Sequence, residues 1–74
     1  MKIVVPYEHD SADLATVWLA VTRDARPGSD DWQPALRDTV DGHRVVWVRV
    51  PDRDASGAVW LRDRDGERRA RRLT

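Results

Sequence analysis

Trp18, Trp47 and Trp60 each stand between two aliphatic residues, in Val-Trp-Leu or Val-Trp-Val tripeptides. Side chains alternate between the two faces of a β-strand, so each tryptophan points away from its aliphatic neighbours. In this phase Arg49 and Arg62 share the tryptophan face. Tryptophan and arginine are enriched at the energetic centres of interfaces. The pattern predicts a non-catalytic interaction module that binds a protein partner or associates with itself.

The opposite face of the same strands supplies the expected core. Its members are aliphatic residues in a single alternating phase: Val17, Leu19, Val21, Val46, Val48, Val50, Val59 and Leu61. A different interpretation is that the tryptophan face is itself buried, under the loop 24–34, a helix or a second sheet, because small proteins rarely expose large apolar patches.

Nucleic-acid binding is an alternative function, since indoles stack on bases and guanidinium groups contact phosphates. The residues that would serve it are Trp47, Trp60, Arg49, Arg62, Arg69 and Arg72. Against it, acidic residues interrupt the C-terminal arginine run, and the sequence pI is about 6.7. Basic nucleic-acid-binding domains commonly have a pI above about 9. We interpret the run first as a solvated face or tail, next as a site for an acidic partner, and last as a phosphate-binding site.

A second alternative is a calcium-dependent loop over residues 52–63. Asp52, Asp54, Ser56 and Asp63 match ligand positions of an EF-hand loop. However, an EF-hand requires flanking helices and a bidentate glutamate at its last position, whereas a strand pattern ending in Pro51 precedes this loop. The same residue types also form an ordinary turn. No cofactor is expected.

The inventory for catalysis is sparse, and the chain is not expected to be an enzyme. His9, Asp10 and Ser11 are the residue types of a catalytic triad, but adjacent residues cannot face one another in a relay. His43 follows a predicted turn and is expected to be exposed. The sequence contains no cysteine nucleophile and no glycine-rich phosphate loop.

The elements that would position these side chains are predominantly β-strands. Residues 2–8 are rich in β-branched types, with Pro6 indicating an edge strand. Residues 16–23 alternate as a strand, although a helix over about 11–25 is an alternative that would give an α+β fold. Residues 24–34 read as a loop that Trp32 anchors to the domain.

The second half of the sequence reads as a β-meander. Asp41-Gly42 predicts a type I′ hairpin between strands at 36–40 and 43–50, because both residues tolerate positive φ. A polar connection at 52–57, a strand at 58–62 and a tight turn at 63–66 follow. Beyond about residue 67 the chain is basic and could be a flexible tail.

Five to six short strands in a chain of this size predict an all-β domain, either a small closed barrel or a meander. Residues 43–50 followed by Gly57-Ala58-Val59-Trp60-Leu61 resemble the paired strands of bacterial SH3-type domains. This resemblance implies an SH3-like barrel at the level of fold. The peptide-binding aromatic set of eukaryotic SH3 domains is matched only at Tyr7, so the resemblance implies no binding residues.

Composition is consistent with one small domain over residues 1–74. The absence of cysteine and of an N-terminal apolar stretch favours a cytoplasmic protein, and no segment has the roughly 18 apolar residues of a membrane span. Arginine outnumbers lysine twelve to one, which is typical of a high-GC bacterial or phage genome. Formal net charge is zero, although the C-terminal half is basic and the N-terminal half acidic.

Overall fold

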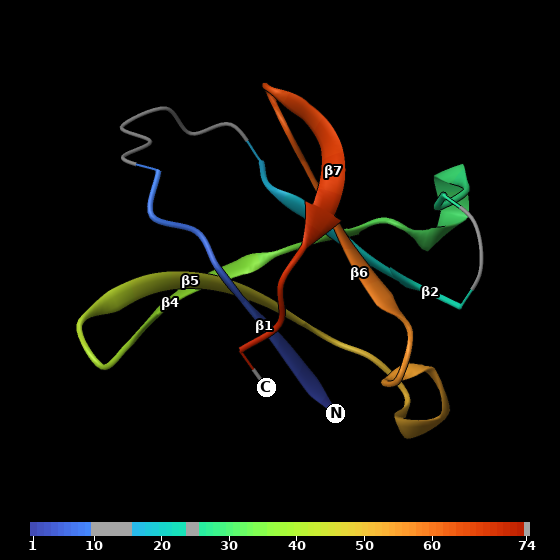
Figure 1. The fold of residues 1–74 in the computed structure, drawn as a ribbon, viewed down its shortest axis with the longest axis horizontal. Coiled ribbons are helices and arrows are strands. Elements are labelled where there is room, and N and C mark those ends of the chain that lie inside the picture. The colour runs from blue at the N-terminus through green and yellow to red at the C-terminus, as the bar shows by residue number, and fades with distance from the viewer. Residues whose placement is uncertain (10–15, 24–25, 74) are drawn as a thin grey trace.

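The computed structural model describes residues 1–9, 16–23 and 26–73, and these form seven strands in two antiparallel sheets (Figure 1). The strands in chain order are β1 Lys2–Pro6, β2 Trp18–Thr22, β3 Gln33–Pro34, β4 Leu36–Val40, β5 His43–Arg49, β6 Ala58–Asp63 and β7 Gly66–Ala70. One sheet has the order β1-β5-β4, and the other has the order β3-β2-β6-β7.

The core lies between the two sheets, on the face that the alternation predicts. The buried cluster contains every residue of the predicted aliphatic phase except Val21, which packs against it half-buried. Ile3, Val5, Tyr7 and Ala55 complete the cluster. Antiparallel strands with one packed face alternate apolar and polar residues, which is why the sequence revealed this phase.

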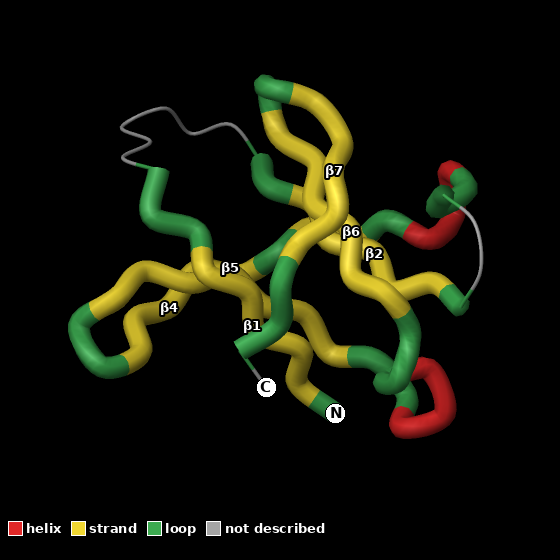
Figure 2. Tube along the Cα trace, viewed as in Figure 1, coloured by secondary structure: helices red, strands yellow, loops and turns green. Residues whose placement is uncertain are grey.

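The all-β prediction is confirmed, and the predicted strand at 16–23 is observed as β2. Trp18–Thr22 is therefore not helical, and the α+β alternative is wrong over these residues. The rest of the proposed helix, at residues 11–15 and 24–25, lies outside the described residues. In the described part of the chain, the helical segments are two 3-10 turns, Ser29–Asp31 and Asp52–Asp54 (Figure 2).

Both predicted hairpin turns are present. Asp41 and Gly42 have φ of 52° and 83°, as a type I′ turn between β4 and β5 requires. The β6–β7 turn instead has positive φ only at Gly66, at 114°. Gly66 pairs with Asp63, which starts the β6–β7 ladder directly at the turn. The residues after 66 therefore continue as a paired strand, β7.

The sheets do not close into a barrel, so the barrel prediction is wrong in this respect. The Ala35 N–H donates to the Val17 carbonyl at 2.7 Å, which extends the β2–β3 pairing to the point where the chain passes to β4. Beyond the end of β7, the Leu73 N–H donates to the Val4 carbonyl of β1 at 2.8 Å. Among the described residues, this bond links the chain that follows one sheet to the edge strand of the other, without a continuous ladder.

Edge positions follow the proline rule. β1 is an edge strand of its sheet, and Pro6 occupies its last position, as predicted. Trp32 is buried and anchors the segment before β3, which confirms the interpretation of that loop. Across the described ranges, no helix is long and apolar enough to span a bilayer.

Candidate functional site

Trp18, Trp60 and Arg62 lie on the outer face of the β3-β2-β6-β7 sheet. Arg62 of β6 is the direct cross-strand partner of Trp18 in β2, and Trp60 lies diagonally to that pair because Ala20 is its partner. All three side chains are half-buried. Neighbouring side chains on one face of an antiparallel pair contact one another. The structure therefore brings three of the predicted partner-binding residues together.

Arg62 is held by two indole rings. Its guanidinium carbon lies 5.2 Å from the centre of the Trp18 ring and 4.8 Å from that of Trp32. Cations over indole faces within about 6 Å are attracted by the ring quadrupole. Trp32, which was predicted as an anchor and not as a site residue, thus belongs to the site. Trp32 lies just before β3 and outside any predicted strand, so the alternation of side chains could not place it beside Arg62.

Trp60 is flanked by two further arginines. The guanidinium carbons of Arg26 and Arg69 each lie 5.8 Å from the centre of its ring. Arg69 is the cross-strand neighbour of Trp60 in β7. Arg26 also lies 3.7 Å from the Glu67 carboxylate. We call the set Trp18, Trp32, Trp60, Arg26, Arg62 and Arg69 the tryptophan–arginine face.

Trp47 and Arg49 are not part of this face. They lie in β5 of the other sheet, on its outer side, where Trp47 is half-buried and Arg49 is exposed. The Lys2 ammonium lies 4.3 Å and the Arg49 guanidinium 5.7 Å from the centre of the Trp47 ring. Lys2 also approaches Asp38 at 3.7 Å. The five predicted partner-binding residues therefore divide between two sheets.

The residues predicted for nucleic-acid binding divide in the same way. Trp60, Arg62 and Arg69 belong to the tryptophan–arginine face, whereas Trp47 and Arg49 belong to the other sheet. Arg72 donates a hydrogen bond to the carbonyl of Ala55. Its side chain therefore helps to fasten the end of the chain to the connection before β6.

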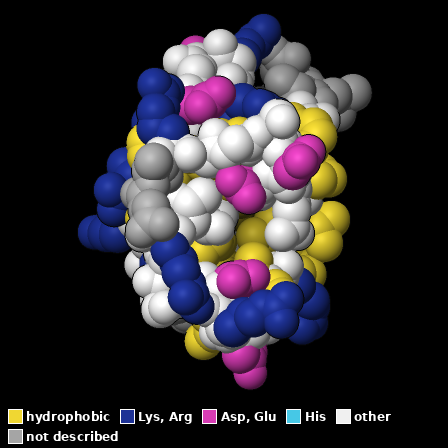
Figure 3. All heavy atoms as spheres, turned by 90° about the vertical axis from the view of Figure 1, so that its right-hand side faces the viewer, with side chains coloured by type: hydrophobic (Ala, Val, Ile, Leu, Met, Phe, Trp, Pro, Cys, Tyr) yellow, Lys and Arg dark blue, Asp and Glu magenta, His cyan; other side chains and the backbone are white. Residues whose placement is uncertain are grey.

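The surface carries both signs of charge. Figure 3 shows one side of the molecule, on which basic side chains gather toward the margins and acidic side chains lie among them. This arrangement agrees with the formal net charge of zero. On this side the molecule presents no continuous basic field of the kind that tracks a phosphate backbone.

The residues of the suggested calcium loop are not brought together. Asp52 and Asp54 form the 3-10 turn before β6, and Asp63 lies at the far end of β6. A strand rises about 3.3 Å per residue, so the six residues of β6 separate these groups by well over a coordination distance.

Asp63 instead forms a partly buried polar cluster with Tyr7 and Arg68. Its side chain is 2% exposed and both oxygens are used. Oδ1 accepts from Arg68 Nη1 and the Asp65 N–H, each at 2.9 Å. Oδ2 accepts from the Tyr7 hydroxyl at 2.7 Å and from Arg68 Nη2 at 3.0 Å. The Arg68 contact is bidentate, the strongest geometry for such a pair.

These contacts shift the ionisation of all three groups. The hydrogen bonds from Arg68 hold the pKa of Asp63 well below its usual range, although burial opposes them. Burial, together with the hydrogen bond to Asp63, raises the pKa of Tyr7 to about 12. The hydrogen bond to Asp63 raises the pKa of Arg68 above its ordinary value. Tyr7 is therefore a neutral donor, which makes the cluster structural in character.

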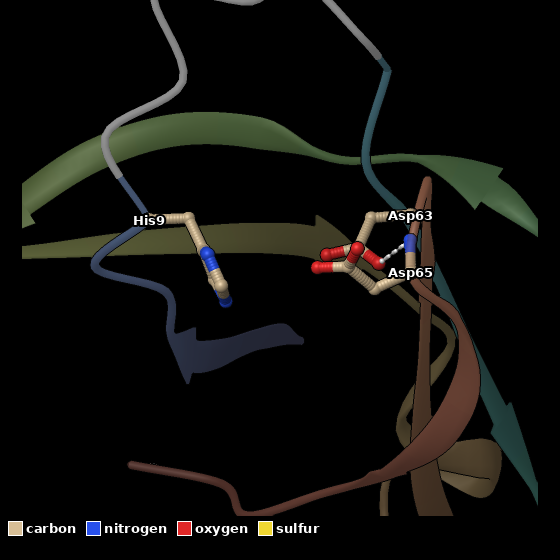
Figure 4. Close-up of side chains that lie close together, drawn as sticks. All are labelled: His9, Asp63 and Asp65. Carbon is tan, nitrogen blue, oxygen red and sulfur yellow. Dashed lines mark hydrogen bonds between the residues drawn. The ribbon is translucent and has the colours of Figure 1, made fainter.

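His9 faces the Asp63 and Asp65 carboxylates across a gap (Figure 4). One ligand atom from each of these residues lies within 4.8 Å of the others. Asp63 already accepts four hydrogen bonds, including two from a cation, which leaves it poorly suited to bind a metal. The predicted exposure of His43 is confirmed, and its Nδ1 lies 2.9 Å from Glu8 Oε1.

A hollow of about 500 Å³ lies where the end of β1, the β4–β5 turn and the residues after β7 meet. Pro6, Val40 and Leu73 contribute its apolar lining, and the His43–Glu8 pair borders it. Tyr7, His9 and Arg68 line a second open hollow of about 410 Å³. Among the described residues that line these hollows, we find no nucleophile placed beside a base and an oxyanion donor.

Comparison with known proteins identifies no relative: no family model, no curated protein and no solved structure matches this chain.

Proposed function

We propose that the protein is a non-catalytic interaction module that binds a protein, either a separate partner or a second copy of itself, through the tryptophan–arginine face. The observation that carries this proposal is the gathering of three indoles and three guanidinium groups on one sheet face. Trp18 and Trp60 remain partly accessible there. Interface centres favour these residue types because they combine large contact areas with directional hydrogen bonding.

Protein binding is favoured over nucleic-acid binding because Trp47 and Trp60 lie on different sheets and cannot serve as one stacking platform. The near-neutral pI also argues against a nucleic-acid-binding module. An SH3-like relationship remains a proposal at the level of fold, supported by the small paired strands alone.

The test compares Trp60→Thr with Trp47→Thr, since both remove a half-buried outer-face indole from a central strand. Light scattering over a range of concentrations measures self-association, and quantitative affinity capture with mass spectrometry measures partners. We expect Trp60→Thr to abolish dimer formation or the capture of particular proteins, and Trp47→Thr to leave both intact. If the wild type is monomeric and the two variants capture the same proteins as wild type, the proposal is wrong.

A further inference from the structure

Arg62 contacts two aromatic rings, but no described residue accepts a hydrogen bond from its guanidinium group. Two indoles fix its guanidinium in place. Within the described residues, no hydrogen bond or ion pair engages that guanidinium. Arg68 provides a contrast, because both of its terminal nitrogens donate hydrogen bonds to the Asp63 carboxylate.

The acidic residue that pairs with Arg62 across the strands is engaged elsewhere. Glu67 is the direct cross-strand partner of Arg62 in β7, yet the Glu67 carboxylate forms its ion pair with Arg26 at 3.7 Å. The three arginines of the face and Glu67 together carry a charge of +2. The charge complement of this face is therefore an anionic group.

From this geometry, and resting on the proposed function, we infer that Arg62 binds a carboxylate in an acidic segment of a partner protein. A guanidinium presents a planar fork of donors that matches the two oxygens of a carboxylate. Trp18 and Trp32 hold this fork in one orientation before binding, so less side-chain entropy is lost when the carboxylate arrives. Trp60 and Arg69 lie beside it and would contact the flanking residues of the segment.

An acidic protein segment is favoured over a phosphate backbone because the cationic area is small. Three arginines around two partly exposed indoles can accommodate a few carboxylates, whereas tracking a nucleic acid requires an extended basic groove.

The experiment titrates the full chain with an acetylated, amidated hexaglutamate peptide and, separately, with an oligothymidylate. Tryptophan fluorescence reports binding at low and moderate salt. Loss of one bidentate charged contact should weaken peptide binding about 10-fold or more in Arg62→Gln. Arg62→Lys retains the charge but loses the fork, so we expect it to weaken binding as well.

Arg49→Gln is the matched control, because Arg49 also lies over an indole but on the other sheet. Its change in net charge equals that of Arg62→Gln, so the two variants differ only in where the charge is removed. We expect Arg49→Gln to bind the peptide within about twofold of wild type, because the lost charge is on the other sheet. Thermal unfolding of each variant establishes that the fold is retained.

The inference is overturned if Arg62→Gln binds like wild type, if Arg49→Gln is equally impaired, or if the oligothymidylate binds more tightly than the peptide. It is also overturned if the wild type does not bind the peptide. In each case, if Trp60→Thr still abolishes the capture of particular proteins, the proposed function stands. Only the assignment of a carboxylate to Arg62 is then wrong.

Discussion

Asp63 shows how a single side chain can join separate segments of this domain. A carboxylate that is 2% exposed would be costly to bury alone, but four hydrogen bonds and the Arg68 cation offset that cost. The cluster joins β6, β7 and the residue after β1, and so fixes the three segments to one another.

Asp63→Asn should destabilise the fold by about 2 kcal/mol, because it weakens the hydrogen bonds made at a side chain that is itself 2% exposed, while solvent at the partly exposed Arg68 screens the loss of the counter-charge. Urea unfolding of wild type and variant measures the difference. Asp65→Asn is the control, since Asp65 contributes its backbone N–H to the cluster, and it should change stability by less than about 0.5 kcal/mol. Equal effects of the two substitutions would contradict the assigned role of Asp63.

At the scale of elements, the close approach of the connection before β6 to the end of β2 depends on Gly57. A Cβ built at Gly57 would lie 2.5 Å from the Thr22 carbonyl oxygen and 2.9 Å from its carbon. These are backbone atoms of the neighbouring strand, which cannot move without disturbing the β2–β6 ladder.

Gly57→Ala should therefore destabilise the domain by about 1–3 kcal/mol, since β2 and β6 must separate where Thr22 pairs with Ala58. Gly28→Ala provides the comparison, because its Cβ would meet nothing closer than 3.6 Å and its backbone is extended. Thermal unfolding would distinguish them. A Gly57→Ala protein as stable as the Gly28→Ala protein would refute the steric argument.

Most of the strands could be predicted from the sequence because alternation and turn residues are local signals. The Asp41-Gly42 hairpin and the core phase of Val17, Leu19, Val46 and Val48 are of this kind. Pairing partners were not accessible in the same way. No feature of the sequence near Trp47 indicates that β5 pairs with β1 and β4, or that the strand of Trp60 belongs to a different sheet.

The site was predictable only in part for the same reason. Strand phase placed Trp18, Trp60 and Arg62 opposite the core. The contacts of Arg62 with Trp32 and of Trp60 with Arg26 join a strand to the connection before β3, which no periodicity encodes. The Tyr7–Asp63 hydrogen bond joins residues 56 positions apart, and the sequence pattern assigned Asp63 to a turn.

At the scale of the whole molecule, the polar cluster limits stability at both extremes of pH. The pKa of Asp63 is lower in the fold than in the unfolded chain, so its stabilisation is complete above the unfolded value of about 3.9 and is lost as pH falls. The pKa of Tyr7 is raised to about 12, so its stabilisation is complete below the unfolded value of about 10 and is lost as pH rises toward 12.

We therefore expect the free energy of unfolding to decline below about pH 4 and again above about pH 10, as measured by urea titration at a series of pH values. Tyr7→Phe cannot ionise, so the decline attributable to Tyr7 should disappear while the acid decline remains. An alkaline profile identical in wild type and Tyr7→Phe would show that Tyr7 does not ionise differently in the fold.

The order of strand pairing has a consequence for folding during synthesis. β1 pairs with β5, and β2 pairs with β6, so the paired residues of each early strand lie between 36 and 47 positions later in the chain. A growing polypeptide can form the β4–β5 hairpin by itself, but neither sheet can be completed until most of the chain has left the ribosome. The core between the two sheets therefore forms only after β6 has been synthesised, and until then β2 has no partner in that strand.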